Sequence, residues 1–343
     1  MGNGLFAICD IPQGTRILAE APILSTSSVL RHHDQLPEFC NLLQRLSKAK
    51  LKELDQLKSV PKYTGFERQR IRQIVRQWYK HQAFGDVKRF PLKGKDLREF
   101  AETTVTRFEI FLFLAEDLGV DSSYGTGVFP LWARVNHSCI PNSYKWYNLD
   151  IKRLTLHAIR DIQAGEEITA DYYGGIADSH EQFRLILLSK WIFECSCEAC
   201  TNPAYYPERQ HMYYLNKRLK IYRTQNEEGS SAPGRSLMPR NHPEAIQDLE
   251  DLIESLKRQG MESSALVNTY RTCSMFNLEA KISYEDALHY AEKAAELQRR
   301  IMGTETEHLR QDMVGAEYWL EYVRETVMTE CDEVRHISAY PDL

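Results

Sequence analysis

Hydrophobic and polar positions repeat with two different periods along this 343-residue chain. Residues 4–24 contain short strand-like runs around Pro12-Gln13-Gly14, which predict a small β-hairpin. Residues 124–173 return to strand-like runs, with the clearest strand predicted at 154–159. From about residue 30 to 115 the apolar spacing is helical instead. The pattern therefore predicts a β-rich domain that a helical insertion divides.

The last third of the chain has a helical pattern. Residues 226–240 concentrate Gly, Ser and Pro without a period and predict a loop. A helix is expected to begin at Asn241 or His242 and to end near Gly260. Three more helices are expected after it, one over 264–279 and one that Ser283 caps and Gly303 ends. These two resemble one tetratricopeptide unit, and a plain helical bundle is the alternative.

Composition and charge narrow the class of protein. Hydrophobic residues make up 43% of the chain and charged residues 27%, as in ordinary globular domains. No apolar run is long enough to span a membrane and no secretory signal opens the sequence, so we expect an intracellular protein, cytoplasmic or nuclear, that contacts no membrane and is a monomer.

Basic residues are concentrated in the predicted insertion. Residues 41–98 hold 16 Lys and Arg against 5 Asp and Glu, although the whole chain has a net charge of -5. An apolar helical repeat accompanies these charges, at Ile71, Ile74, Val75, Trp78 and Tyr79. This favours the solvated face of an amphipathic helix, and binding of nucleic acid or of an acidic protein surface stays open.

Three of the eight cysteines crowd together at Cys195, Cys197 and Cys200. Thiolates this close in a reducing compartment indicate zinc, and a closed shell of four cysteines indicates a structural ion. Cys139 is the favoured fourth ligand, while free thiols or a redox relay are alternatives. For Cys9, Cys40 and Cys273 we expect buried small hydrophobic side chains, and Cys331 has no assigned role.

Four segments in one order carry a family resemblance: GNGLFA at 2–7, NHSCIPN at 136–142, GEEITADYY at 165–173 and FECSCEAC at 193–200. Together they resemble the SET domain, and most closely the SET enzymes that usually also carry a MYND zinc finger. This sequence holds no MYND-like array of Cys and His. The resemblance implies an α+β fold with these parts: a SET domain at 1–27 and 116–180, a helical insertion at 28–115, a post-SET zinc segment at 181–202 and an all-α domain at 203–343.

The resemblance also implies roles for single residues. Tyr172 is expected to be the catalytic tyrosine, and Tyr173 to pack inward. Residues Gly2, Asn3, Gly4, Asn136, His137, Tyr172 and Phe193 are expected to bind the cosubstrate S-adenosylmethionine. Trp191 and Phe193 are expected to line the substrate channel, and Cys139, Cys195, Cys197 and Cys200 to bind zinc.

Three positions depart from the family pattern. Met1 stands where a Lys or Arg commonly precedes the Gly-Asn-Gly, Thr106 where an Asn is expected, and Trp191 where a second channel tyrosine is common. A tryptophan offers no hydroxyl to the channel.

The resemblance implies a protein-lysine N-methyltransferase whose partner is a protein or peptide that contains lysine. Two alternatives belong to other classes. One is a SET-fold scaffold that binds a partner through the helical tail, and the other is a reader of nucleic acid or chromatin that uses the basic insertion.

Overall fold

The computed structural model describes residues 4–26, 36–57, 65–85, 94–118, 124–173, 180–228, 238–305 and 315–338. The chain forms two compact units. The first comprises residues 1–3, 19–135 and 152–154, and the second comprises residues 4–18, 136–151 and 155–343.

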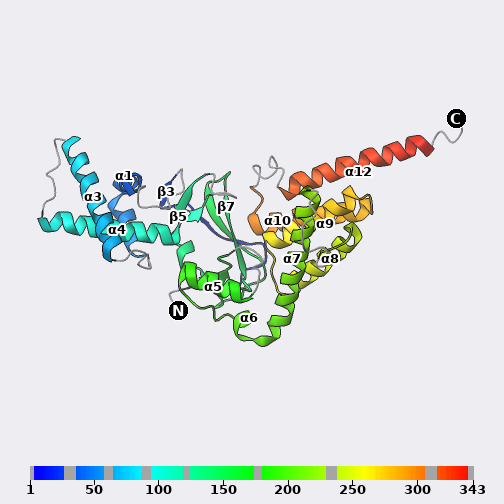
Figure 1. The fold of residues 1–343 in the computed structure, drawn as a ribbon, viewed down its shortest axis with the longest axis horizontal. Coiled ribbons are helices and arrows are strands. Elements are labelled where there is room, and N and C mark those ends of the chain that lie inside the picture. Colours follow the sequence, from blue (N-terminus) through cyan, green and yellow to red (C-terminus); the bar gives the residue numbers. More distant parts are fainter. Residues whose placement is uncertain are drawn as a thin grey trace. The chain divides into compact units, whose positions relative to one another are not determined.

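The first unit combines a small sheet with the helices of the insertion (Figure 1). Its antiparallel strands have the order β3 (Leu24–Thr26), β5 (Thr126–Val128) and β4 (Glu116–Asp117). Its helices are α1 (Leu36–Arg45), α2 (Lys48–Asp55), α3 (Gly65–Gly85), α4 (Gly94–Leu114) and the short η2 (Trp132–Arg134). The core contains Phe39 against Phe108 and Phe111. The prediction of a helical segment between β segments is confirmed for the described residues.

Helix α3 carries the basic residues on an amphipathic frame, as predicted. Ile71, Val75 and Trp78 are buried. Arg68 pairs with Glu102 and with the buried Glu109 of α4, and Arg72 also pairs with Glu102. Part of the basic charge of α3 is therefore balanced within this unit.

Most of a six-stranded sheet belongs to the second unit, except the end of β2 and the start of β8. Five strands have the order β1-β9-β7-β8-β2, and the sixth, β6, pairs with β9. The strands are β1 (Leu5–Phe6), β2 (Arg16–Glu20), β6 (Asn136–His137), β7 (Ser143–Asn148), β8 (Arg153–Ala158) and β9 (Glu167–Ala170). Strand β1 runs antiparallel to β9, and β6 runs parallel to β9. Strand β9 thus joins two distant parts of the sequence, the segment at residues 5–6 and the segment at residues 136–148.

Two sequence predictions near the N-terminus are wrong. The turn at Pro12-Gln13-Gly14 forms, with Gly14 at φ 82°, but its flanking strands do not make a hairpin. Strand β1 pairs with β9 and β2 pairs with β8, so each strand beside the turn has a partner that lies far away in the sequence. Cys9 is exposed rather than buried, since the bend after β1 turns this segment outward and leaves Ile8 98% exposed. Cys40 and Cys273 are buried as predicted.

Helices make up the rest of the second unit. They are α5 (His180–Trp191), α6 (Glu198–Thr201), η3 (Pro203–Tyr205), α7 (Tyr206–Glu228), α8 (His242–Arg258), α9 (Ser264–Glu279), α10 (Tyr284–Met302) and α12 (Ala316–Ser338). Helices α7 to α10 each pack against the next, and α10 packs against both α12 and β7 (Figure 1). The helical tail is therefore docked on its own sheet.

The predicted helix ends are largely confirmed. The side chain of Asn241 caps α8, the side chain of Ser283 caps α10, and Gly303 ends α10 at φ 93°. The predicted loop at 226–240 begins too early, because α7 continues through Glu228. Residues 229–237 of that loop lie outside the described residues.

His157 of β8 is buried beside the end of α10, where a Cβ at Gly303 would lie 3.2 Å from its Nε2. Burial, and then the nearby Arg16, lowers its pKa from 6.5 to about 4. The unfolded chain therefore takes up a proton below pH 6.5 that the folded chain excludes until about pH 4. We expect the free energy of unfolding to fall by about 2 kcal/mol from this residue between pH 7.5 and pH 5.

Urea unfolding at several pH values measures this loss. His157→Gln should flatten the pH dependence, while His211→Gln, a change at an exposed histidine of the same unit, should leave it unchanged. An equal slope for wild type and His157→Gln would contradict the prediction.

Candidate functional site

The site is centred on β9 and the residues that follow it. The parallel pairing of β6 with β9 places Asn136 opposite Thr169 and His137 opposite Ala170. The buried Asn142 secures the same loop, because its amide donates to the carbonyl of Glu167 at 2.8 Å and accepts from the amide of Thr169 at 2.8 Å. The segments NHSCIPN and GEEITADYY therefore form one layer.

Asn136, Glu167 and Gly4 form a polar cradle in that layer. The amide of Asn136 donates to Glu167 Oε1 at 2.6 Å. Gly4 lies so close that a Cβ there would stand 2.1 Å from the same oxygen. Glu167 is a site residue that the sequence analysis missed, although the motif GEEITADYY contains it. Gly2 and Asn3, predicted to act here, lie outside the described residues.

Aromatic rings surround Tyr172 on several sides. Its ring centroid lies 5.4 Å from that of Trp191, 5.3 Å from His137 and 6.2 Å from Phe193. The ammonium of Lys190 sits 4.3 Å above the Trp191 ring. The structure thus brings together the predicted catalytic tyrosine and both predicted channel residues.

Tyr173 does not pack inward as predicted. Its side chain is 43% exposed and meets the edge of Phe183 at 5.8 Å. The chain has left the regular strand at Ala170, so the inward and outward alternation no longer fixes where these side chains point. Phe183 of α5 was missed by the sequence analysis, and its helical spacing to the buried Leu187 was the available signal.

The imidazole of His137 lies between the aromatic rings and the cysteines, and its side chain is 0% exposed. Its Nδ1 accepts from the amide of Tyr172 at 3.2 Å, and its Nε2 lies 3.4 Å from the sulfur of Cys139. Burial lowers the pKa of this histidine from 6.5 to about 4. The ring is therefore neutral at physiological pH.

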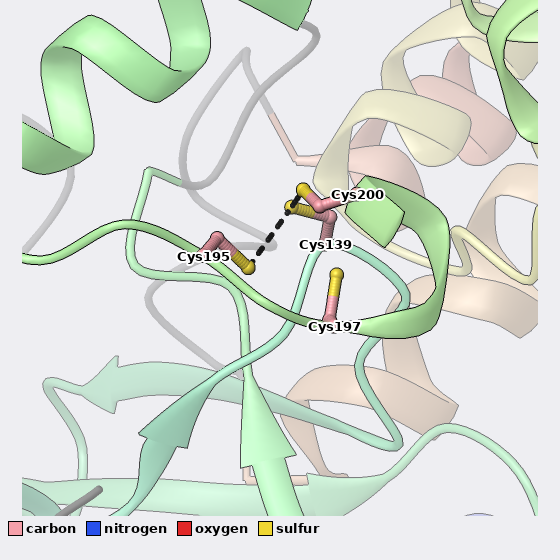
Figure 2. Close-up of side chains that lie close together, drawn as sticks. All are labelled: Cys139, Cys195, Cys197 and Cys200. Atoms are coloured by element: carbon pink, nitrogen blue, oxygen red, sulfur yellow. Dashed lines mark hydrogen bonds between the residues drawn. The ribbon is translucent and has the colours of Figure 1, made fainter. Parts of the chain in front are cut away.

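Four cysteines converge behind this layer, and Figure 2 shows their sulfur atoms turned toward one another. All four Sγ atoms lie within 4.8 Å of each other. The sulfur of Cys139 is 3.4 Å from that of Cys200 and 3.8 Å from that of Cys195, distances too long for disulfides. The turn that begins α6 sets the spacing, because the amide of Cys200 donates to the carbonyl of Cys197.

The electrostatics of this cluster favour a cation. Hydrogen bonds from Cys139, and also from Cys195 and Cys200, hold the pKa of Cys197 far below its ordinary range. The pKa of Cys139 is raised in return by its hydrogen bonds with the neighbouring thiols and by burial. One negative charge forms readily and further ones do not, so four thiolates need a metal ion to gather them. The group could hold such an ion.

The other departures from the family pattern have separate outcomes. Met1 lies outside the described residues. Thr106 belongs to α4, where its hydroxyl donates to the carbonyl of Glu102 and accepts from Arg68 at 3.1 Å. Within the first unit it therefore supports the pairing of α3 with α4.

None of the helices in the described parts of the chain combines the length and apolar composition that crossing a bilayer requires.

Sequence comparison connects this geometry to known proteins. The chain is 29% identical over 200 residues to histone-lysine N-methyltransferase set5 of Schizosaccharomyces pombe, an alignment covering 58% of this chain and 47% of that protein. It is 30% identical over 144 residues to histone-lysine N-methyltransferase SMYD3 of Homo sapiens, covering 41% and 32% respectively. It is 25% identical over 230 residues to a putative SET domain-containing protein of Acanthamoeba polyphaga mimivirus, covering 64% and 84%.

The alignments thus span less than half of the two named enzymes. The SET domain family matches residues 2–173, half of the chain, and this range contains β6, β9, the cradle and Tyr172. The match includes three of the four sequence segments, those at 2–7, 136–142 and 165–173, and the chain belongs to the SET-domain family.

Proposed function

We propose that the chain is a protein-lysine N-methyltransferase that uses S-adenosylmethionine. The observation that carries this proposal is the position of Tyr172, which lies among aromatic rings shortly after β9, the strand on which Glu167 accepts from Asn136 of β6. Two relatives named for histone-lysine methylation support it. A histone is therefore the first substrate to test, which agrees with a nuclear or cytoplasmic location.

The chemistry fits such a site. S-adenosylmethionine supplies an electrophilic methyl group on a sulfonium, and the acceptor must be a neutral amine. A lysine has an ordinary pKa of about 10.4, so the site must lower it. Rings of Tyr172, Trp191 and Phe193 would exclude water from the amine and disfavour its charged form. Tyr172 would align the amine, and alignment of the reacting atoms accelerates such a displacement.

The polar cradle is suited to hold the cosubstrate. The absence of a Cβ at Gly4 lets the carboxylate of Glu167 lie against this backbone, and Glu167 supplies that carboxylate for a cationic group. Asn136 orients that carboxylate through its amide. We propose this cradle as the place where the amino-acid end of S-adenosylmethionine binds, with Phe193 against its adenine.

Gly4→Ala tests the cradle without any methyl acceptor. The added Cβ would stand 2.1 Å from Glu167 Oε1 and must displace that carboxylate. We expect the Kd for S-adenosylmethionine in calorimetry to rise about tenfold, which corresponds to the loss of one charge-assisted hydrogen bond. Gly65→Ala is the matched control, because nothing lies within 4 Å of a Cβ at that position. If Gly4→Ala and Gly65→Ala bound S-adenosylmethionine with equal affinity, the cosubstrate would not bind in this cradle.

Zinc is the ion that we propose for the four cysteines. Zinc–sulfur bonds of about 2.3 Å in a tetrahedron separate the sulfur atoms by about 3.8 Å. The distance from Cys139 to Cys195 is 3.8 Å, and the whole group fits within 4.8 Å. A shell of four thiolates leaves no open position, so the ion would be structural and would join the segment 181–202 to the loop after β6.

A labelling experiment tests the activity. The full chain is incubated with histones or cell extract and with S-adenosylmethionine that carries a deuterated methyl group, and the proteins are analysed by mass spectrometry. We expect labelled methyl groups on lysine side chains. If the cosubstrate binds and no lysine becomes labelled in either mixture, the proposal fails and the binding scaffold is the better description.

A further inference from the structure

The contacts of the two ring nitrogens of His137 argue against a role in binding the cosubstrate. Its imidazole is 0% exposed, and both ring nitrogens face groups of the protein itself. Nε2 lies 3.4 Å from Cys139 Sγ, and Nδ1 lies 3.2 Å from the backbone amide of Tyr172. The ring therefore stands between one proposed zinc ligand and the proposed catalytic tyrosine.

The hydrogen bond from Tyr172 indicates the roles of the two ring nitrogens, because an imidazole nitrogen that accepts a hydrogen bond carries no proton. The backbone amide of Tyr172 donates to Nδ1, which leaves the ring proton for Nε2, and the backbone carbonyl of Ala170 is a further acceptor beside the ring. A thiolate bound to a metal only accepts, and it lies on the Nε2 side. Both contacts therefore require the same tautomer.

The surroundings hold this ring in place. Phe183 lies 5.5 Å and Phe193 lies 5.9 Å from the ring centroid of His137, and Tyr172 packs at 5.3 Å. The carboxylate of Asp171 lies 3.7 Å from Nδ1. A ring confined in this way cannot satisfy the cysteine and the tyrosine independently, because a movement toward one is a movement away from the other.

We propose that His137 is a positioning residue that couples the four-cysteine site to Tyr172. In this coupling Nε2–H donates to the sulfur of Cys139, and Nδ1 holds the backbone of Tyr172 at the end of β9. The inference rests on the proposed function and deepens it, because it makes the placement of Tyr172 depend on the metal. Partners that orient a metal ligand are commonly needed for full metal affinity.

Two conservative variants separate the two halves of the coupling. Asn reaches the place of Nδ1, so His137→Asn retains an acceptor for the Tyr172 amide and loses the donor to Cys139. Gln reaches the place of Nε2, so His137→Gln retains that donor and loses the acceptor. We expect zinc to leave His137→Asn about tenfold faster in the presence of a colorimetric chelator. We expect His137→Gln to hold zinc like the wild type and to lose about tenfold in kcat, with the Kd for S-adenosylmethionine within about threefold of the wild type.

The tautomer can be read in the wild-type chain by nitrogen-15 NMR of its histidines, which requires no variant to fold. We expect a neutral His137 with its proton on Nε2. A proton on Nδ1 would overturn the proposal, and so would equal zinc release and equal kcat in both variants and the wild type. A loss of cosubstrate affinity in His137→Gln as large as its loss of kcat would also overturn the proposal. That result would mean that the ring of His137 binds the cosubstrate. Zinc release and the tautomer are measured without turnover, so an inactive wild-type chain would refute the proposed function alone.

Discussion

Replacing Tyr172 with phenylalanine should lower kcat for lysine methylation by about 100-fold, the size expected when a reacting group loses its alignment. The substitution keeps the aromatic ring, which packs 5.4 Å from Trp191 and 5.3 Å from His137, and removes only the hydroxyl. The fold, the metal content and most of the affinity for S-adenosylmethionine should therefore persist. Steady-state kinetics on the substrate found by the labelling experiment measures the loss.

The neighbouring tyrosine provides a matched control. Tyr173→Phe removes a hydroxyl from a ring that is 43% exposed, and we expect kcat to stay within about twofold of the wild type. Asn136→Ala should differ from both by raising the Kd for S-adenosylmethionine, since it removes the donor to Glu167. If Tyr172→Phe turned over at the wild-type rate, the assignment of the catalytic residue would be wrong even for an active methyltransferase.

Replacing Cys139 with serine should leave the chain with well under one zinc per molecule. A serine hydroxyl is a poor substitute for a thiolate, and the other three cysteines cannot close a tetrahedral shell alone. Structural zinc contributes on the order of 10 kcal/mol to the domains that it folds, and losing even about 3 kcal/mol here would lower the Tm by about 10 °C. Elemental analysis and calorimetry together measure both effects.

Cys9 is the matched control for that substitution. It belongs to the same unit and is exposed, so Cys9→Ser should keep both the zinc content and the Tm. Full zinc content in Cys139→Ser would show that Cys139 is not a ligand. The fourth ligand beside Cys195, Cys197 and Cys200 would then be another residue.

The sequence predicted those parts of the site that short motifs determine. Spacing alone grouped Cys195, Cys197 and Cys200, and the helix caps at Asn241 and Ser283 lie where local hydrogen-bonding chemistry places them. The family resemblance indicated the positions of Tyr172, Trp191 and Phe193, which the structure brings together.

Features that depend on distant pairing could not be predicted in this way. The hairpin near Pro12 failed because Leu5 pairs with Ile168, a partner that no local pattern reveals. Glu167 gains its importance from Gly4 and Asn136, which approach it only in the folded sheet. Burial of Cys9 was predicted from its apolar neighbours in the sequence. The prediction failed because the chain bends there and leaves Cys9 exposed. Residues were therefore identified by motif, whereas their partners required the fold.

The contacts that build the site join residues far apart in the sequence, so the site can form only late in the synthesis of the chain. Cys139 meets Cys200 across 61 residues, and Leu5 of β1 must wait for Ile168 to pair. A ribosome adds residues from the N-terminus, so the strand pairing cannot exist until residue 168 has emerged, and the cysteine contact cannot exist until residue 200 has emerged. Long-range contacts of this kind are the slow ones in folding. Capture of the proposed zinc ion would then be a late step of maturation, because its four cysteine ligands are all present only after residue 200 has been added.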